Sequence, residues 1–478
     1  MDELEVLKKY FGYEGFRGNQ RDIIKHMLEG EDMLVLMRTG GGKSICYQIP
    51  AIMTKNKLTL IISPLISLIV DQVKELRERD IPVHYYTSES ELNFDTIFSD
   101  IVDGKCNILL TTPETFNMNK KLQKYLSSPQ VDLARVVIDE AHCVSEWGHS
   151  FRPAYKQLNI KQRFPNVQVC AFTATATKIV QYEMCRLLDL NDPLLYVSSF
   201  LRENIRYSVQ VRDPKEKEDN PVFQAKLLKL IKTDKRFINH TGIIYCFKRD
   251  TCDSLARFLK RSGLSAASYH SQSRNKDTIQ ADWTSGKTKI IVATTAFAMG
   301  VNKSNVRYVI HTCLPDSIET YYQQAGRAGR DGLPSIAVLY YNPADATFMK
   351  KLKRGDGKGA PVSPMQKIED MLRYADNRTC CQKQWLSNYL GETDLGSCSD
   401  KEQKCQNCSN GCKTYVISDA SRTRIMKQLP GNFHRIMRFA TSEDKEFIRR
   451  QLNSSILETD MIMHEEGKFE EVLQIKKL

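Results

Sequence analysis

A glycine-rich segment carries residue types that bind phosphate. Residues 38–44 read RTGGGKS and follow the apolar run MLVLM at 33–37. Glycines let backbone N–H groups turn toward an anion, Lys43 can reach the β- and γ-phosphates, and the Ser44 hydroxyl can bind Mg²⁺. Met37 replaces the glycine that normally opens this pattern. The predicted phosphate-binding residues are Thr39, Gly40, Gly41, Gly42, Lys43 and Ser44.

Two further segments supply the carboxylates and the cations that phosphoryl transfer at such a loop requires. The apolar run RVVI ends in Asp139 and Glu140, which we expect to hold Mg²⁺ and to orient or deprotonate the attacking water. Residues 321–332 read YYQQAGRAGRDG, and Arg327 and Arg330 have the spacing expected of arginine fingers for the developing γ-phosphate charge. Gln323 of the same segment is a further candidate catalytic residue.

The elements that position these residues are predicted from hydrophobic periodicity. Short apolar runs alternate with amphipathic stretches over the first 340 residues or so, which indicates parallel α/β sheets with helices on both faces. Because there are too many strands for one sheet, we expect two α/β domains. The glycine-rich loop and the acidic pair fall in the first domain and the two arginines in the second, so we expect ATP to lie between the two domains. The predicted strands are MLVLM, LTLIIS, NILLTT, RVVID, VQVCAFT, TGIIYCF, KIIVATT and VRYVIHT.

The predicted organisation has four units. The two α/β domains cover residues 1–205 and 206–345, and a helical, cysteine-rich module follows at 346–415. Residues 416–478 contain two helical patterns and then a hairpin that turns near Glu466, which is typical of a small winged-helix-like domain.

Composition sets the remaining bounds. The chain has 478 residues, and its 69 basic and 57 acidic residues give a net charge of +12. This excess suits a polyanionic partner, but a basic enzyme without one fits equally well. The longest apolar runs are too short to span a bilayer and the N-terminus lacks an apolar signal core, so we expect an intracellular protein without membrane contact.

At this point the motifs resemble, in order, those of superfamily 2 helicases and, within them, the RecQ family of DNA helicases. The resemblance covers roughly residues 10–412 and implies two RecA-like motor domains, a zinc-binding module and the winged-helix-like domain. The motifs are FRGNQ at 16–20, RTGGGKS, SPLISLIVDQ at 63–72, TTPE at 111–114, DEAH at 139–142, TATAT at 173–177, ATTAFAMGVNK at 293–303 and QQAGRAGR.

The resemblance implies an ATP- and Mg²⁺-dependent helicase that moves 3′-to-5′ on single-stranded DNA and unwinds duplex or forked DNA in repair, recombination or replication. Gln20, with Arg17, would bind the adenine. Expected partners are DNA and, as unidentified candidates, single-strand-binding and repair proteins, in a nucleus or a nucleoid. Two rivals remain, an RNA-directed helicase and a DNA-binding or annealing protein with an inactive motor.

The segment from Ser145 to Tyr155 resembles the aromatic-rich loop with which RecQ proteins sense single-stranded DNA. Aromatic rings stack on bases regardless of sequence, and the loop follows Asp139 and Glu140 closely. The alternative is that Trp147, Phe151 and Tyr155 pack between domains. The candidate DNA-binding residues are Trp147, His149, Phe151 and Arg152.

Six of the 14 cysteines crowd into residues 380–412. The resemblance implies that this module binds Zn²⁺, which takes four thiolates. The implied ligands are Cys381, Cys398, Cys405 and Cys408, and a competing set has Cys412 in place of Cys398. In the last domain, His464 and Phe469 are candidates for a strand-separating wedge, and Arg449 and Arg450 either contact phosphates or lie on a solvated helix face.

Overall fold

The fold is described here from a computed structural model of the whole chain. The description covers residues 1–478 with the exception of 146–150, 191, 214–215, 217, 298–302, 355–361, 379, 393–397, 399–402, 411–430, 433–456, 464–468 and 476–478.

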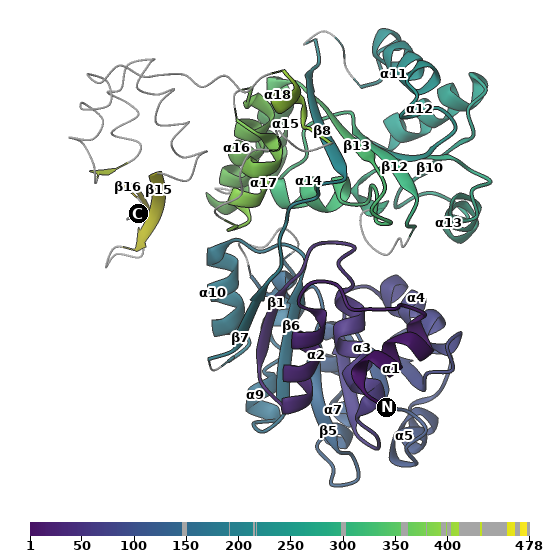
Figure 1. Cartoon of the computed structure of the whole chain (residues 1–478), viewed down its shortest axis with the longest axis vertical. Coiled ribbons are helices and arrows are strands. Elements are labelled where there is room, and N and C mark those ends of the chain that lie inside the picture. Colours follow the sequence, from purple (N-terminus) through teal and green to yellow (C-terminus); the bar gives the residue numbers. More distant parts are fainter. Residues whose placement is uncertain are drawn as a thin grey trace.

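The first domain is built on a seven-stranded sheet in which every pair is parallel (Figure 1). The strand order is β3-β4-β2-β5-β6-β1-β7. The central strands are almost completely buried, because both faces of the sheet are covered. The strands are β1 (Met33–Leu36), β2 (Leu58–Ile62), β3 (Val83–Tyr86), β4 (Ile108–Thr111), β5 (Leu133–Ile138), β6 (Gln168–Thr173) and β7 (Leu194–Val197).

Successive residues of β1 show how this sheet forms two cores. Leu34 and Leu36 belong to one apolar cluster, while Met33 and Val35 belong to the other, as the two-residue period of a strand requires. The helical segments are α1 (Glu3–Val6), η1 (Leu7–Phe11), α2 (Gln20–Glu29), α3 (Lys43–Met53), α4 (Ile66–Arg77), α5 (Phe94–Val102), α6 (Pro113–Met118), α7 (Lys120–Leu126), η2 (Ala141–Val144), α8 (Pro153–Lys156), α9 (Ile160–Arg163) and α10 (Lys178–Leu187).

The second domain repeats this design with a six-stranded parallel sheet of order β10-β11-β9-β12-β13-β8. Its strands and covering helices are β8 (Ile205–Val211), α11 (Pro221–Thr233), β9 (Thr241–Tyr245), α12 (Arg249–Arg261), β10 (Ala266–Tyr269), α13 (Lys276–Thr284), β11 (Ile290–Ala293), η3 (Thr295–Phe297), β12 (Val306–His311), α14 (Ile318–Ala325) and β13 (Ser335–Tyr341). The prediction of two parallel α/β sheets is confirmed.

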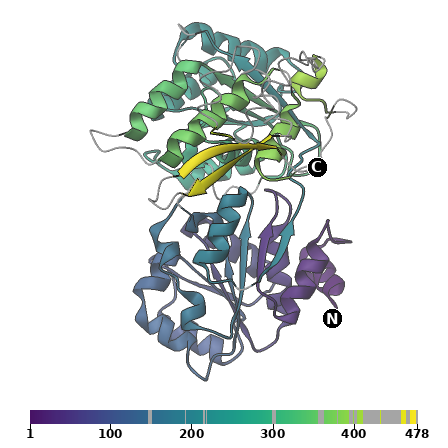
Figure 2. The ribbon, with the colours of Figure 1, turned by 90° about the vertical axis from the view of Figure 1, so that its left-hand side faces the viewer.

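A helical module packs on the second domain. It consists of α15 (Pro343–Arg354), α16 (Val362–Asp376), α17 (Gln382–Tyr389) and α18 (Gln406–Ser409). Residues of α16 and α17 share an apolar cluster with one face of the second sheet, whereas α11 and α12 cover the other face. In Figure 2 the green helices of this module lie in front of the upper sheet.

The last described elements form an antiparallel sheet of order β14-β16-β15. They are β14 (Gly431–Asn432), β15 (Leu457–Met463) and β16 (Phe469–Ile475). Met463 pairs with Phe469, so the predicted hairpin is confirmed. The helical part of the expected winged-helix-like domain, with Arg449 and Arg450, lies outside the described residues, and so does the hairpin turn with His464. Among the described helices, none has the length and apolarity needed to cross a membrane.

Candidate nucleotide and nucleic-acid site

The glycine-rich loop lies between the end of β1 and the start of α3, where backbone N–H groups and the helix dipole both favour an anion. Gly42 has a φ of 83° and caps α3, a left-handed conformation that suits glycine. A Cβ at Gly42 would lie 2.3 Å from Nε2 of Gln20. The Nζ of Lys43 donates to the carbonyl of Met37 at 3.4 Å. The local sequence therefore folds as a compact loop in front of α3.

Gln20 joins the FRGNQ segment to this loop. Its buried side chain donates from Nε2 to the carbonyls of Gly41 and Gly42, at 3.1 and 3.2 Å. The backbone N–H of Arg17 donates to Oε1 of Gln20 at 2.8 Å. The two predicted adenine-binding residues thus lie at the glycine-rich loop.

Asp139 lies at the carboxyl end of β5 and is buried. Its Oδ1 accepts from the backbone N–H of Glu140 at 3.0 Å, and its Oδ2 accepts from the Ser63 hydroxyl at 3.5 Å. Burial, followed by the Glu140 charge, raises the pKa of Asp139 to about 6. A divalent cation would stabilise the ionised forms of these two neighbouring carboxylates. The hydroxyl and carboxylate oxygens of Ser44 and Asp139 are the hard ligands that Mg²⁺ prefers, so these residues fit the ion.

Glu140 begins a chain of contacts that crosses between the domains. Its φ is 48°, a left-handed backbone conformation of the kind that costs on the order of 1–3 kcal/mol and collects at functional sites. The Oε2 atom of Glu140 lies 3.2 Å from Nδ1 of His142. The same Nδ1 atom lies 2.8 Å from the Thr173 hydroxyl. The neighbouring Thr175 hydroxyl accepts from Gln323 of the second domain at 3.4 Å.

The two candidate arginine fingers lie in the turn that follows α14. Arg327 is buried, and Arg330 reaches the phosphate loop of the first domain, because a Cβ on Gly40 would lie 3.3 Å from Cγ of Arg330. Burial, followed by the charges of Arg327 and Arg202, lowers the pKa of Arg330 to about 9. Crowded cations around a phosphate loop favour a polyanionic ligand.

The aromatic segment is described in part, since Trp147 and His149 lie outside the described residues. Phe151 is 36% exposed, and the Nζ of Lys156 lies 5.1 Å from its ring centroid. Arg152 donates from Nη1 to the carbonyl of Pro64, and its Nη2 lies 3.6 Å from Oε1 of Glu114. Arg152 therefore connects this segment to the SPLISLIVDQ and TTPE motifs.

Tyr155 is the last residue of the segment expected to contact DNA, but its ring is buried and is not available for stacking on a base. Its side chain is fully buried in the apolar cluster of the first domain, and its hydroxyl donates to the carbonyl of Asp139 at 2.9 Å. Sequence alone did not separate Tyr155 from Phe151, because both follow the DEAH motif with similar spacing. The structure makes Tyr155 a core residue that touches the acidic pair.

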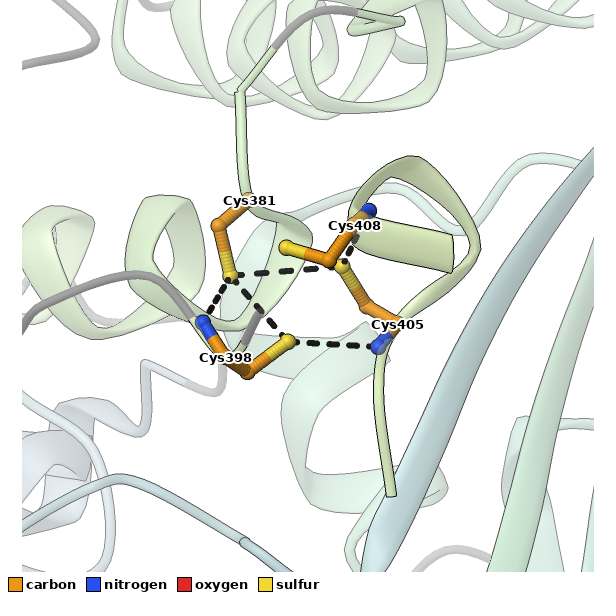
Figure 3. Close-up of side chains that lie close together, drawn as sticks. All are labelled: Cys381, Cys398, Cys405 and Cys408. Carbon is orange, nitrogen blue, oxygen red and sulfur yellow. Dashed lines mark hydrogen bonds between the residues drawn. The ribbon is translucent and has the colours of Figure 1, made fainter. Parts of the chain in front are cut away.

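Four cysteines point toward a common centre in the helical module (Figure 3). The sulfur atoms of Cys381, Cys398, Cys405 and Cys408 all lie within 4.8 Å of one another, and none is in a disulfide. The Cys381 sulfur is 3.5 Å from that of Cys398 and 3.9 Å from that of Cys405. A tetrahedral Zn²⁺ site has sulfur–sulfur edges of about 3.8 Å, so the set fits zinc. Cys412 lies outside the described residues.

Backbone N–H groups also point at this cluster. The N–H groups of Gln382 and Cys408 donate to the Cys405 sulfur at 3.4 and 3.5 Å, and that of Cys398 donates to the Cys381 sulfur at 3.4 Å. Such donors stabilise thiolates, the form that binds metal. This arrangement is not visible in the spacing of the cysteines.

Three protein families match consecutive parts of the chain. The DEAD/DEAH box helicase family matches residues 17–182, and the helicase conserved C-terminal domain matches residues 224–332. The RecQ zinc-binding family matches residues 343–412, which contain the four clustered cysteines.

Several curated proteins are similar to this chain over most of its length. The ATP-dependent DNA helicase RecQ of Haemophilus influenzae is 39% identical over 86% of this chain and 64% of its own length. The RecQ-like DNA helicase BLM of Xenopus laevis is 38% identical, over 87% of this chain and 31% of its own length. A Caenorhabditis elegans protein of the DNA helicase Q1 type is also 38% identical, over 88% of this chain and 67% of its own length. The chain thus spans less than two thirds of the first two relatives.

Solved structures of lower identity share the fold. The helicase MrfA bound to DNA and AMPPNP has a TM-score of 0.58 at 17% identity, over 83% of this chain and 58% of that chain. The Saccharomyces cerevisiae protein Dbp5 bound to RNA and ADP BeF3 has a TM-score of 0.57 at 16% identity, over 78% of this chain and 97% of that chain. Since one holds DNA and the other RNA, this likeness establishes the fold alone.

Proposed function

Because the chain belongs to the RecQ family of DNA helicases, we propose that it hydrolyses ATP to move 3′-to-5′ along single-stranded DNA and to unwind duplex or forked DNA. The observation that carries this proposal is the meeting of the two domains at the nucleotide loop. Arg330 of the second domain packs against Gly40 of the first, so both halves of a phosphoryl-transfer site face one ligand position.

Each candidate residue then has a role in that site. Residues 39–44 bind the phosphates, with Lys43 as the cation and Ser44 and Asp139 as the residues that would hold Mg²⁺. Bound Mg²⁺ would supply charge neutralisation on the phosphates. Glu140 orients the attacking water, and Gln323, Arg327 and Arg330 stabilise the charge that develops on the transferred group. Arg17 and Gln20 bind the adenine, next to the phosphate loop.

DNA contacts the segment that follows the acidic pair. Trp147, His149 and Phe151 stack on or contact bases, and Arg152 lies against the carbonyl of Pro64 and the carboxylate of Glu114. Stacking on aromatic rings is tolerant of sequence, as a translocating motor requires. The clustered cysteines hold Zn²⁺ as a structural ion. The chain is divided into the four predicted domains, at residues 1–205, 206–345, 346–415 and 416–478. Such an enzyme acts in a nucleus or nucleoid, beside single-strand-binding and repair proteins.

The test is the Lys43→Ala variant, with Lys57→Ala as its control. Lys57 pairs with Asp132 at 3.4 Å on the exposed surface and is not part of the candidate site. We expect Lys43→Ala to lower the rate of DNA-stimulated ATP hydrolysis on the order of 100-fold, since it removes a cation from the phosphates. Unwinding of a DNA fork should be lost in parallel. Wild-type protein that prefers an RNA fork, or Lys43→Ala protein that unwinds normally, would contradict the proposal.

A further inference from the structure

The short segment between β7 and β8 joins the two domains and contacts the first domain, the second domain and the helical module. The Phe200 side chain is 1% exposed in the apolar cluster of the first domain. Its carbonyl accepts from the Tyr322 hydroxyl at 2.6 Å, and its backbone N–H donates to Oε2 of Glu392 at 2.8 Å. The connection is therefore a packed junction rather than a loose tether.

Arg202 of this segment binds both halves of the nucleotide site. Its Nη1 donates to the carbonyl of Thr39 in the phosphate loop at 3.2 Å and to that of Gly326 at 2.9 Å. Its Nη2 donates to the carbonyls of Ala328 and Gly329 at 2.8 and 3.0 Å. One guanidinium group thus links the phosphate loop to three backbone carbonyls on either side of Arg327.

Arg202 is a buried cation whose acceptors in these contacts carry no charge. Arg202 is 6% exposed, and all four of these acceptors are neutral backbone carbonyls. Taking a charge out of water without an opposite charge is costly, and burial lowers the pKa of Arg202. An apolar residue at this position would leave these four carbonyls without this donor, which also carries a cost. The rigid, planar fork of arginine donors matches several carbonyls at once, which lysine, as a point charge on a flexible stem, does not.

We propose that Arg202 is the positioning residue that fixes the arginine-finger turn against the phosphate loop, so that it controls the rate of hydrolysis rather than the binding of ATP. This inference rests on the proposed function, because it takes Arg327 and Arg330 to be the fingers. The nucleotide loop and the turn come from different domains, and Arg330 must stay next to Gly40 to reach the transferred phosphate. A shift of about 1 Å at such a group costs on the order of 100-fold in rate.

The experiment compares Arg202→Gln and Arg202→Lys with Arg206→Gln. Arg206 lies four residues further along, in β8, and donates to the Ser409 hydroxyl at 3.1 Å, away from the nucleotide loop. The measurements are kcat and KM for ATP with saturating single-stranded DNA, and the binding of ADP and of ADP with aluminium fluoride, which mimics the transition state.

We expect Arg202→Gln to lower kcat on the order of 100-fold and to lose binding of the aluminium fluoride complex, while KM for ATP and ADP binding stay near wild type. The kcat of Arg202→Lys should lie between those of wild type and Arg202→Gln, because lysine keeps the charge but donates to fewer carbonyls. Arg206→Gln should match wild type. A structural role alone would weaken ADP binding and the mimic equally, and that result would overturn the proposal.

A wild-type kcat in Arg202→Gln would also overturn it. If Arg202→Gln does not fold, Arg202→Lys decides, and a wild-type kcat in that variant rejects the proposal. Lys43→Ala separates the two levels of inference. If Lys43→Ala is inactive while Arg202→Gln hydrolyses normally, only the role of Arg202 fails. If Lys43→Ala hydrolyses ATP normally, the proposed nucleotide site itself fails.

Discussion

At the residue scale, a buried histidine in the second domain responds to pH. His311 is 2% exposed, stacks on the ring of Tyr245 at 5.2 Å between centroids, and lies 2.9 Å through Nε2 from Oε1 of Gln324. Its buried Nδ1 has no hydrogen-bond partner among the described residues. Protonation would place an unsatisfied charged N–H in the core, so burial lowers the pKa of His311 from 6.5 to about 4.

This shift predicts a loss of stability in mild acid. Between pH 6.5 and 4 the unfolded chain binds a proton at His311 that the folded chain does not bind, so unfolding becomes more favourable as pH falls. The contribution is about 2 kcal/mol between pH 7.5 and pH 5. We expect denaturant unfolding of wild type to show this slope and His311→Gln to show a shallower one. Equal slopes in the two proteins would contradict the assignment.

Residue types predicted most of the candidate site but not its connections. Each of the motifs RTGGGKS, DEAH and QQAGRAGR holds its candidate residues within a few positions of one another, so the sequence pattern identifies them. Arg202 carries no such signal, because its acceptors lie at Thr39 and at residues 326–329, far away in sequence. The burial of Tyr155 was likewise not predictable, since an aromatic ring has the same sequence signal in a core and on a surface.

At the scale of elements, apolar patterning predicts central strands better than edge strands. Eight strands of the two parallel sheets were predicted, and four of the five other strands described in these sheets are the edges β3, β7, β8 and β10. Residues on these strands are in part exposed, and every residue of β10 is only partly buried. A strand with one open side loses the continuous apolar run. The fifth, β13, is an interior strand with the usual apolar signal.

The helical module is tied to the motor domains through polar contacts. The Nζ of Lys383 in α17 donates to the carbonyl of Glu203 at 2.6 Å, next to Arg202. Gln406 in α18 accepts through Oε1 from the backbone N–H of Val209 in the edge strand β8 at 2.8 Å. Both helices begin at a clustered cysteine, Cys381 or Cys405. A metal that holds the cluster would therefore also hold the edge strand and the interdomain segment.

The zinc proposal predicts different behaviour for two nearby cysteines. Cys398→Ser should reduce bound zinc from one ion per chain to near zero and lower the thermal midpoint, because a structural Zn²⁺ contributes folding free energy. Cys380→Ser should keep its zinc, since Cys380 is not part of the cluster. Atomic absorption on gel-filtered protein measures both. Full zinc in Cys398→Ser, with loss in Cys412→Ser, would favour the competing ligand set.

At the scale of the whole molecule, the described contacts join the candidate DNA segment to the nucleotide site by a short route. Tyr155 anchors the far end of that segment to the carbonyl of Asp139, and Arg152 ties its middle to Pro64 and Glu114. From Glu140 the contacts continue through His142 to the TATAT motif and across to Gln323. Bases stacked on Phe151 would therefore act on a segment fixed to the acidic pair.

The Trp147→Ala, Phe151→Ala double variant tests this coupling. We expect it to lose the stimulation of ATP hydrolysis by single-stranded DNA and to bind that DNA about 10-fold or more weakly, because each base–aromatic stack is worth about 1–3 kcal/mol. Basal hydrolysis should persist, since Lys43, Asp139 and the arginines are untouched. Leu195→Ala, which truncates a 56% exposed apolar side chain on the edge strand β7, is the control. Equal stimulation in the double variant and the control would make these rings packing residues and place the DNA sensor on another element.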